Sequence, residues 1–125
     1  MKTIVNTKSA PAAIGPYSQG TIHNGTLYVS GQLPINPTTG ELSSGDIKEQ
    51  TTLVMTNLKA IVEAAGSDLK KVLKCTILLT DMTNFAAMNE AYGAFFKEEP
   101  PARICYQVSV LPKGAIVEID AVCAV

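Results

Sequence analysis

The sequence contains few of the residues that form metal, nucleotide and nucleic-acid sites. Its one histidine, His23, has no partner at metal-ligand spacing, and there is neither a Cys-x-x-Cys pair nor an acidic cluster, so we expect no metal site. No glycine-rich phosphate loop follows a strand-like segment, which argues against a nucleotide site. A net charge of −1, a pI near 5.7 and 6% aromatic residues offer nucleic acid neither a basic patch nor a stacking platform.

Cysteine and long apolar runs are also scarce. The residues Cys75, Cys105 and Cys123 are an odd number at wide intervals, which argues against disulfides and favours a reducing cytosol. No apolar run has the length of a signal-peptide core or a membrane span, so we expect a cytoplasmic protein with no membrane partner. The 125 residues, of which 46% are hydrophobic, suffice for a single domain over residues 1–125 with a sizeable core.

Hydrophobic periodicity and turn residues predict a sheet of five or six strands and two helices. Asn24-Gly25 between two apolar arms is a strong hairpin signal. Asp46, followed three residues later by Glu49, opens an amphipathic helix that ends at Gly66. The expected strands are 20–23, 26–30, 72–79, 100–110 and 115–122, the expected helices are 46–66 and 84–96, and residues 14–20 form an ordered loop. The order is therefore β-β-α-β-α-β-β.

Two helices can cover only one face of such a sheet. The other face keeps valine, isoleucine and alanine among its polar residues. A sheet face of this character usually packs against another subunit, so we expect an oligomer.

The last quarter of the chain predicts a hairpin of two half-buried strands joined at Leu111–Gly114. If the turn is centred there, Gln107 pairs with Glu118 and Cys105 pairs with Asp120. This register places the polar side chains of both strands, Arg103 among them, on one surface of the sheet.

Arg103 is the only arginine, since nine of the ten basic residues are lysine. A guanidinium differs from an ammonium in that it can bind a carboxylate or phosphate at two points. In the expected register, about 13 Å of strand separates Arg103 from Glu118, at roughly 3.3 Å per residue, which leaves room for a small anion. The alternative is an ordinary solvated arginine or a pair with a surface glutamate.

For the other candidate residues, a catalytic role is weighed against a purely structural one. Glu118 and Asp120 are equal candidates for a partly buried carboxyl group that transfers protons near neutral pH. Cys105 as a nucleophile would need a nearby base, and His23 beside the Asn24-Gly25 turn is better read as a solvated turn residue.

Several segments together resemble the Rid (YjgF) family of reactive-intermediate deaminases, close to its RidA branch. They are residues 12–19 (AAIGPYSQ), 30–32 (SGQ), 85–89 (FAAMN), 101–103 (PAR), 111–114 (LPKG) and 117–119 (VEI), in order along the whole chain. The resemblance implies a chorismate-mutase-like, YjgF-like α+β fold with a mixed sheet, and a homotrimer with a cleft between neighbouring subunits. It also implies cofactor-free hydrolysis of 2-imino acids, such as 2-iminopropanoate and 2-iminobutanoate, and of their enamine tautomers.

The resemblance further implies a role for each matching residue. Arg103 would hold the substrate carboxylate, Glu118 would position water, and Tyr17 would close the pocket and supply a hydroxyl. The binding residues would be Ser30 and Gly31 in a turn, the backbone of Cys105, Phe85 as an apolar wall, and Asn89 from the neighbouring subunit.

Two other functions stay open. One is a non-enzymatic regulator that binds a 2-oxo acid or an amino acid in the same pocket. The other is an endoribonuclease or translation inhibitor, as some relatives are described, which the single arginine and acidic pI disfavour.

Overall fold

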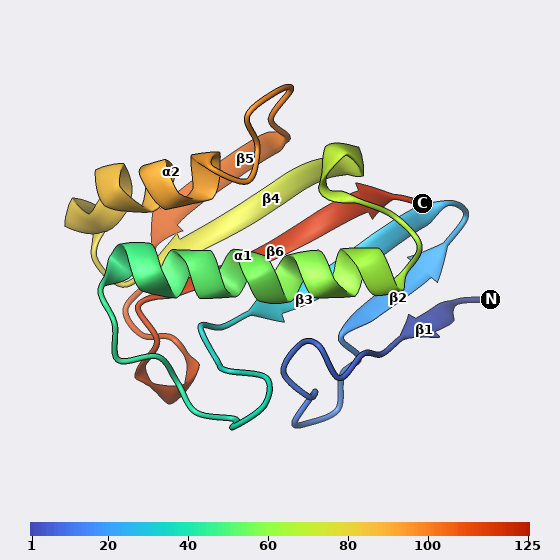
Figure 1. Cartoon of the computed structure of the whole chain (residues 1–125), viewed down its shortest axis with the longest axis horizontal. Helices are drawn as coiled ribbons and strands as arrows, with labels where there is room; N and C mark the ends of the chain where they lie inside the picture. The colour runs from blue at the N-terminus through green and yellow to red at the C-terminus, as the bar shows by residue number, and fades with distance from the viewer.

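The C-terminal strand β6 lies at the centre of the structure, because the strands before and after the first helix both pair with it. The computed structural model describes residues 1–125 as a six-stranded mixed sheet in the order β1-β2-β3-β6-β4-β5, with two helices on one face (Figure 1). The strands are β1 Thr3–Val5, β2 Gly20–His23, β3 Thr26–Gln32, β4 Val72–Leu79, β5 Ala102–Gln107 and β6 Val117–Ala124, and the helices are α1 Ile47–Ala64 and α2 Phe85–Gly93. The expected α+β class, the mixed sheet and the position of the helices are confirmed.

Helix α1 forms for the local reasons that the sequence predicts. The Asp46 side chain accepts a hydrogen bond from the Glu49 backbone N–H at 2.9 Å and caps the first turn, and Gly66 follows the last turn with a φ of 83°. One stripe of the helix is fully buried against the sheet, namely Val54, Met55, Leu58, Ile61 and Val62. Burial of each such side chain contributes about 1.5–3 kcal/mol, so this stripe fixes α1 on β3 and β6.

The predicted C-terminal hairpin is wrong. Strand β5 pairs with β4 in parallel, β6 pairs with β4 antiparallel on its other side, and the two predicted arms never touch as neighbours. Their alternation and turn residues identify two strands and a turn, but they cannot identify the partner of each strand. The chain instead passes the end of β4, where Val108 N–H donates to the Leu79 carbonyl and Thr80 N–H donates to that of Ile116.

Three smaller predictions also need correction. Residues 3–5 form an additional edge strand, β1, against β2, so the order has one more strand than predicted. Helix α2 is shorter than 84–96, because a separate 3₁₀ turn, Met82–Asn84, precedes it and the helix ends at Gly93. The Ser30-Gly31-Gln32 segment ends β3 as an irregular strand and is not a turn outside it.

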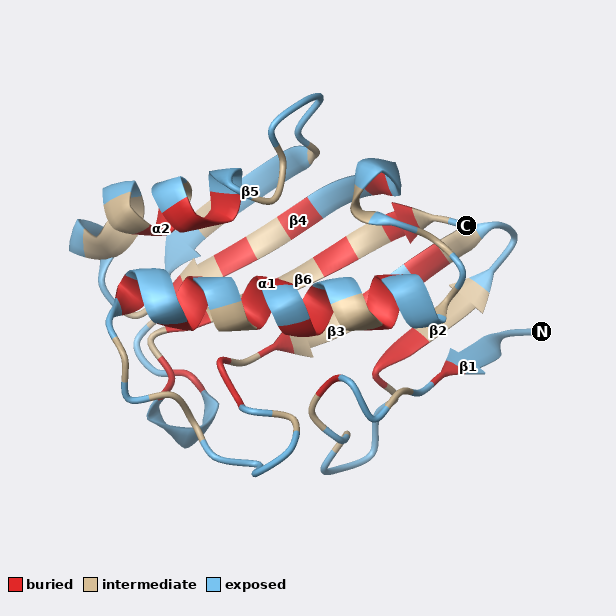
Figure 2. Ribbon diagram, in the orientation of Figure 1, coloured by how far each residue is buried: buried red, intermediate tan, exposed pale blue.

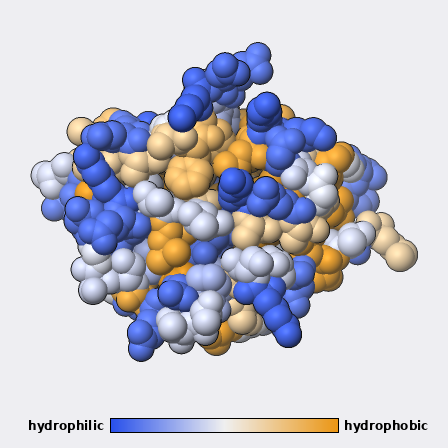
Figure 3. Space-filling model, viewed as in Figure 1, coloured by the Kyte–Doolittle hydropathy of each residue, from blue (hydrophilic) through white to orange (hydrophobic).

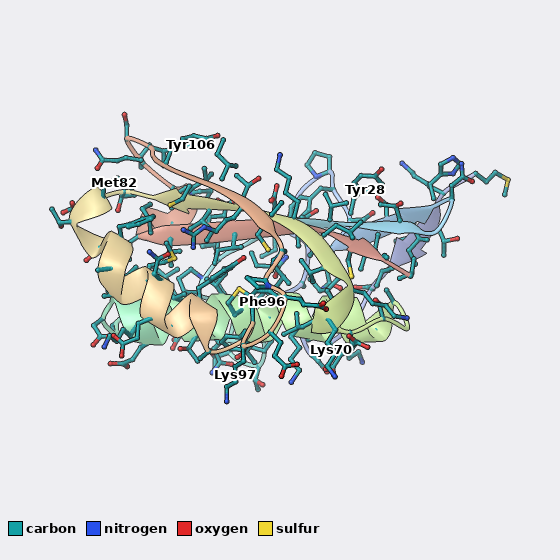
Figure 4. All side chains as sticks on the ribbon, turned by 90° about the horizontal axis from the view of Figure 1, so that it is seen from above. Tyr28, Lys70, Met82, Phe96, Lys97 and Tyr106 are labelled. Carbon is teal, nitrogen blue, oxygen red and sulfur yellow. The ribbon has the colours of Figure 1, made fainter.

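The two faces of the sheet differ in how they are covered. The helix side buries alternate strand residues in the core (Figure 2), and the outer surface of this side mixes hydrophilic and hydrophobic residues (Figure 3). Figure 4 shows the helices on one side of the sheet and Tyr28 and Tyr106 on the other. Tyr28, Ile104 and Tyr106 are about half exposed there, at 52%, 48% and 49%. No helix in the structure is both long and apolar enough to cross a membrane.

Candidate functional site

A pocket of about 470 Å³ opens where β3 and the start of β6 meet two loops, residues 7–19 and the turn at residues 111–114. The first loop, residues 7–19, is held by the buried side chain of Gln19. Its carbonyl accepts from the Thr7 N–H at 2.7 Å, and its amide donates to the backbone carbonyls of Thr7, Ala10 and Pro11. The Ser30 hydroxyl donates to the Ser18 carbonyl at 2.6 Å and ties the same loop to β3. These bonds place the adjacent Tyr17, whose side chain is half exposed, at the pocket wall.

Gly31 occupies a bulge in β3, where Val29 pairs with Ala121 but Gln32 pairs with Ile119. The Glu118 side chain lies directly over Gly31. A Cβ atom at residue 31 would overlap the Glu118 carboxylate and would stand 2.9 Å from its Cδ atom. Glycine is therefore required here for close approach, and the carboxyl group rests against the backbone of the bulge.

The Glu118 carboxyl group is available for chemistry. It is half-buried in the pocket wall and forms neither a hydrogen bond nor an ion pair within the chain, in which the one salt bridge joins Lys48 to Glu90. Burial raises the pKa of Glu118, and the nearby charge of Asp120 raises it further. A carboxyl group of this kind exchanges a proton more readily near neutral pH than an exposed glutamate does.

Asp120, the other candidate for the proton-transferring carboxyl group, has a structural role. Its Oδ1 atom accepts a hydrogen bond from the backbone N–H of Thr76 at 2.9 Å, which joins β6 to β4. Asp120 does not line the pocket, whereas Glu118 does. The geometry therefore favours Glu118 of the two.

The pocket brings together four of the predicted site residues: Tyr17, Ser30, Gly31 and Glu118. Sequence reasoning missed Gln19 and Lys113, which also line it. Lys113 has a left-handed backbone with a φ of 60°, unusual for a residue with a Cβ atom. In the sequence, Pro112 and Gly114 indicate only a turn; in the structure, Pro112 and Lys113 of that turn line the pocket.

The other predicted site residues gather around Arg103, between β5 and α2. The Arg103 Nη1 atom donates to Oδ1 of Asn89 at 2.6 Å. The guanidinium carbon lies 5.5 Å from the centre of the Phe85 ring and 5.3 Å from that of Tyr92. Arg103 forms no ion pair, so its positive charge is not neutralised by a carboxylate of the same chain. The reading of Arg103 as the partner of a surface glutamate is therefore wrong.

Neither Cys105 nor His23 has the setting of a catalytic group. Burial raises the pKa of the Cys105 thiol, although the Arg103 charge acts in the opposite direction, so the thiolate is disfavoured. His23 is exposed in the β2–β3 hairpin, where its Nδ1 atom is 3.0 Å from the Met1 carbonyl oxygen. No three histidine, cysteine or acidic side chains lie close enough together to hold a metal ion.

Arg103 and Glu118 lie on opposite faces of the sheet within one chain, contrary to the predicted register. Arg103 pairs with Cys75, which is buried on the helix side, whereas Glu118 pairs with Leu78. Leu78 lies three residues after Cys75 on β4, an odd number, so the two residues face opposite sides of the sheet. Residues paired across adjacent strands point to the same face of the sheet. The parallel β4–β5 register therefore places the Arg103 side chain on the face that α2 covers. Asn89, expected from a neighbouring subunit, contacts Arg103 of its own chain.

Known proteins match this chain over nearly its whole length. The family model described as Endoribonuclease L-PSP matches residues 7–125. The 2-iminobutanoate/2-iminopropanoate deaminase of Capra hircus is 45% identical over 122 residues, which cover 98% of this chain and 89% of the relative.

Two solved structures have the same fold. RidA of an Antarctic Psychrobacter species is 45% identical with a TM-score of 0.95, and covers 98% of this chain and 99% of its own. E. coli TdcF, solved with bound serine, is 41% identical with a TM-score of 0.94 and covers 98% of each chain. On these grounds the protein belongs to the Rid/YjgF/RutC family, whose model is named for endoribonuclease L-PSP.

Proposed function

We propose that the protein hydrolyses 2-imino acids, such as 2-iminopropanoate and 2-iminobutanoate, and their enamine tautomers to 2-oxo acids and ammonia. The observation that carries the proposal is the unpaired Glu118 carboxyl group against the Gly31 backbone, in a pocket also lined by Tyr17. The deaminase named above, which is 45% identical, supports the same reaction.

The chemistry requires little beyond orientation and charge stabilisation, because an imine carbon is already electrophilic. Glu118 accepts a proton from water as the oxygen bonds to the imine carbon. Proton transfer to nitrogen completes a carbinolamine and makes its amine a leaving group. The C–N bond then breaks as the hydroxyl loses its proton, which releases ammonia and forms the carbonyl of the 2-oxo acid. Arg103 holds the substrate carboxylate, and the Tyr17 hydroxyl closes the pocket. No covalent bond to the protein is formed.

We further propose that each site is assembled from two copies of the chain, within a homotrimer. Arg103 and Glu118 face opposite sides of one sheet, so they can act on one small molecule only if a neighbouring copy supplies one of them. The half-exposed Tyr28, Ile104 and Tyr106 on the open face provide an apolar surface for such contact.

The activity is tested by adding the protein to a pyridoxal-phosphate dehydratase that releases imines from serine or threonine. Micromolar wild-type protein is expected to speed 2-oxo acid release, and Arg103→Ala is expected to abolish the effect. Lys59→Ala, which removes an exposed cation of α1, is the matched control and should act as wild type. Unchanged release with wild-type protein would refute the proposed activity.

The shared site is tested by mixing Arg103→Ala chains with Glu118→Gln chains after reversible dissociation. Random mixing leaves about a quarter of the sites with both native groups, so activity should return to about that fraction of wild type. Mixtures as inactive as each variant alone, although shown by mass measurement to be mixed oligomers, would place both groups in one chain.

A second candidate, a regulator that binds an amino acid or a 2-oxo acid, is favoured by the serine found in the TdcF structure. Binding of pyruvate or serine in calorimetry without any effect on imine hydrolysis would support it. Ribonuclease activity is tested with the same variants, and RNA cleavage that Arg103→Ala leaves unchanged would point to a different site or a contaminant.

A further inference from the structure

We infer that helix α2 positions the Arg103 guanidinium, with Tyr92, Asn89 and Phe85 acting on the arginine rather than on the substrate. This assignment rests on the proposed function for its effect on catalysis, but the positioning itself can be measured without it. Tyr92 belongs to none of the segments that carry the family resemblance.

The three residues form one stripe of α2. Phe85, Asn89 and Tyr92 stand four and then three positions apart, which places them on the same face of a helix. That face meets the β5 residue Arg103: the two rings approach the guanidinium at 5.5 and 5.3 Å, and Asn89 accepts from Nη1 at 2.6 Å. The guanidinium therefore has contacts to two ring faces and one directed hydrogen bond.

All three contacts are electrically neutral, and this decides what they can do. A carboxylate at residue 89 would also orient the arginine, but it would neutralise the charge that an anion must find. Ring faces and an amide oxygen restrict the guanidinium and leave its charge uncompensated. The remaining N–H donors are free for a planar carboxylate.

Tyr92 is itself closely packed. It is 5% exposed, and its ring lies 5.0 Å from that of Phe96. Its hydroxyl has no well-formed hydrogen bond; the thiol of Cys75 is its polar neighbour. Burial raises the pKa of Cys75 to about 11, so the thiol stays neutral and does not compete for the arginine. The ring, not the hydroxyl, is thus the part of Tyr92 that acts on Arg103.

This distinction gives a matched pair of variants. Tyr92→Phe keeps the ring and removes only the unpartnered hydroxyl, whereas Tyr92→Leu removes the ring face and keeps an apolar side chain. Asn89→Leu removes the acceptor at similar size, and Asn89→Asp keeps an acceptor but adds a charge. Phe95→Leu controls for loss of packing: Phe95 is a partly buried aromatic residue just beyond α2, whereas the rings that lie over the guanidinium are those of Phe85 and Tyr92.

Because Arg103 is the only arginine, a ¹⁵N-labelled sample gives a single arginine Nε–H signal. In wild type, Tyr92→Phe and Phe95→Leu, its heteronuclear NOE should match that of the ordered backbone. In Tyr92→Leu and Asn89→Leu it should fall towards the value of a free side chain. Thermal unfolding identifies variants that have lost the fold, and Asn89, only partly buried, provides a test if Tyr92→Leu unfolds.

The kinetic readout separates positioning from general damage. Loss of a cation–π contact should raise KM for the imino acid about tenfold with kcat nearly unchanged, since carboxylate binding is common to substrate and transition state. Asn89→Asp should also raise KM although its arginine remains ordered. A folded Tyr92→Leu or Asn89→Leu protein with wild-type NOE and KM would overturn the inference while the proposed activity stands. A wild-type protein without activity would refute only the proposed function, because the NOE test remains valid.

Discussion

Replacement of Gly31 by alanine tests whether the position of the Glu118 carboxylate, and not only its presence, sets the reaction rate. The added Cβ would stand 2.9 Å from the Cδ atom of Glu118 and 3.2 Å from its Cγ atom, with a carboxylate oxygen nearer still. The side chain must therefore swing away by on the order of 1 Å. A displacement of this size at a reacting group costs about a hundredfold in rate, which corresponds to about 2.7 kcal/mol of activation free energy.

Stability should change far less than activity in this variant. The clash involves a side chain that is only half-buried and has no partner to lose, and a rotamer change costs on the order of 1 kcal/mol. Gly93→Ala is the matched control, because a Cβ there meets nothing within 4 Å and the residue ends helix α2. That control should keep full activity and gain up to about 1 kcal/mol in stability.

The assay combines 2-oxo acid release in the coupled dehydratase reaction with thermal unfolding. Gly31→Ala is expected to lose kcat with little change in melting temperature. Full activity in Gly31→Ala would contradict the assigned place of Glu118. A loss of activity that tracks unfolding would show instead that the glycine serves the fold of β3.

Three further predictions concern carboxylates. Folding raises the pKa of Glu118 above its usual 4.5, so the folded chain binds the Glu118 proton more tightly than the unfolded chain does. Protonation of Glu118 therefore stabilises the fold, and this stabilisation is lost as the pH rises through the folded pKa. In urea unfolding, Glu118→Gln should therefore gain stability relative to wild type between pH 4 and pH 7; a constant difference would contradict the raised pKa. Asp120→Ala should lose about 1–3 kcal/mol because the Thr76 N–H loses its acceptor, while Asp120→Asn keeps an acceptor and most of the stability, and equal losses would argue against the bond. Asp46→Ala should cost about 1 kcal/mol through the lost cap of α1, as measured by denaturant midpoint, with activity unchanged; an unaltered midpoint would refute the cap.

Local features of the fold could be predicted from the sequence because they depend on neighbouring residues. Asn24-Gly25 adopts the positive φ values, 50° and 76°, that a tight hairpin turn needs. Asp46 caps α1, and strand Val72–Leu79 has the predicted bounds. The sequence segments that contain Tyr17, Gly31 and Glu118 identify these three residues as candidates, and all three line the same pocket.

Only the tertiary structure decided which strands pair and, with that, which side each candidate residue faces. The sequence between Ala102 and Ala124 alternates like a hairpin, yet β4 lies between its two arms, because the crossover through α2 delivers β5 to β4 in parallel. Since successive strand residues point to opposite faces, the register sets Arg103 against α2 and Glu118 against the open face. Residue identity determined what the two groups can do chemically, and strand pairing determined that within one chain they lie on opposite faces of the sheet.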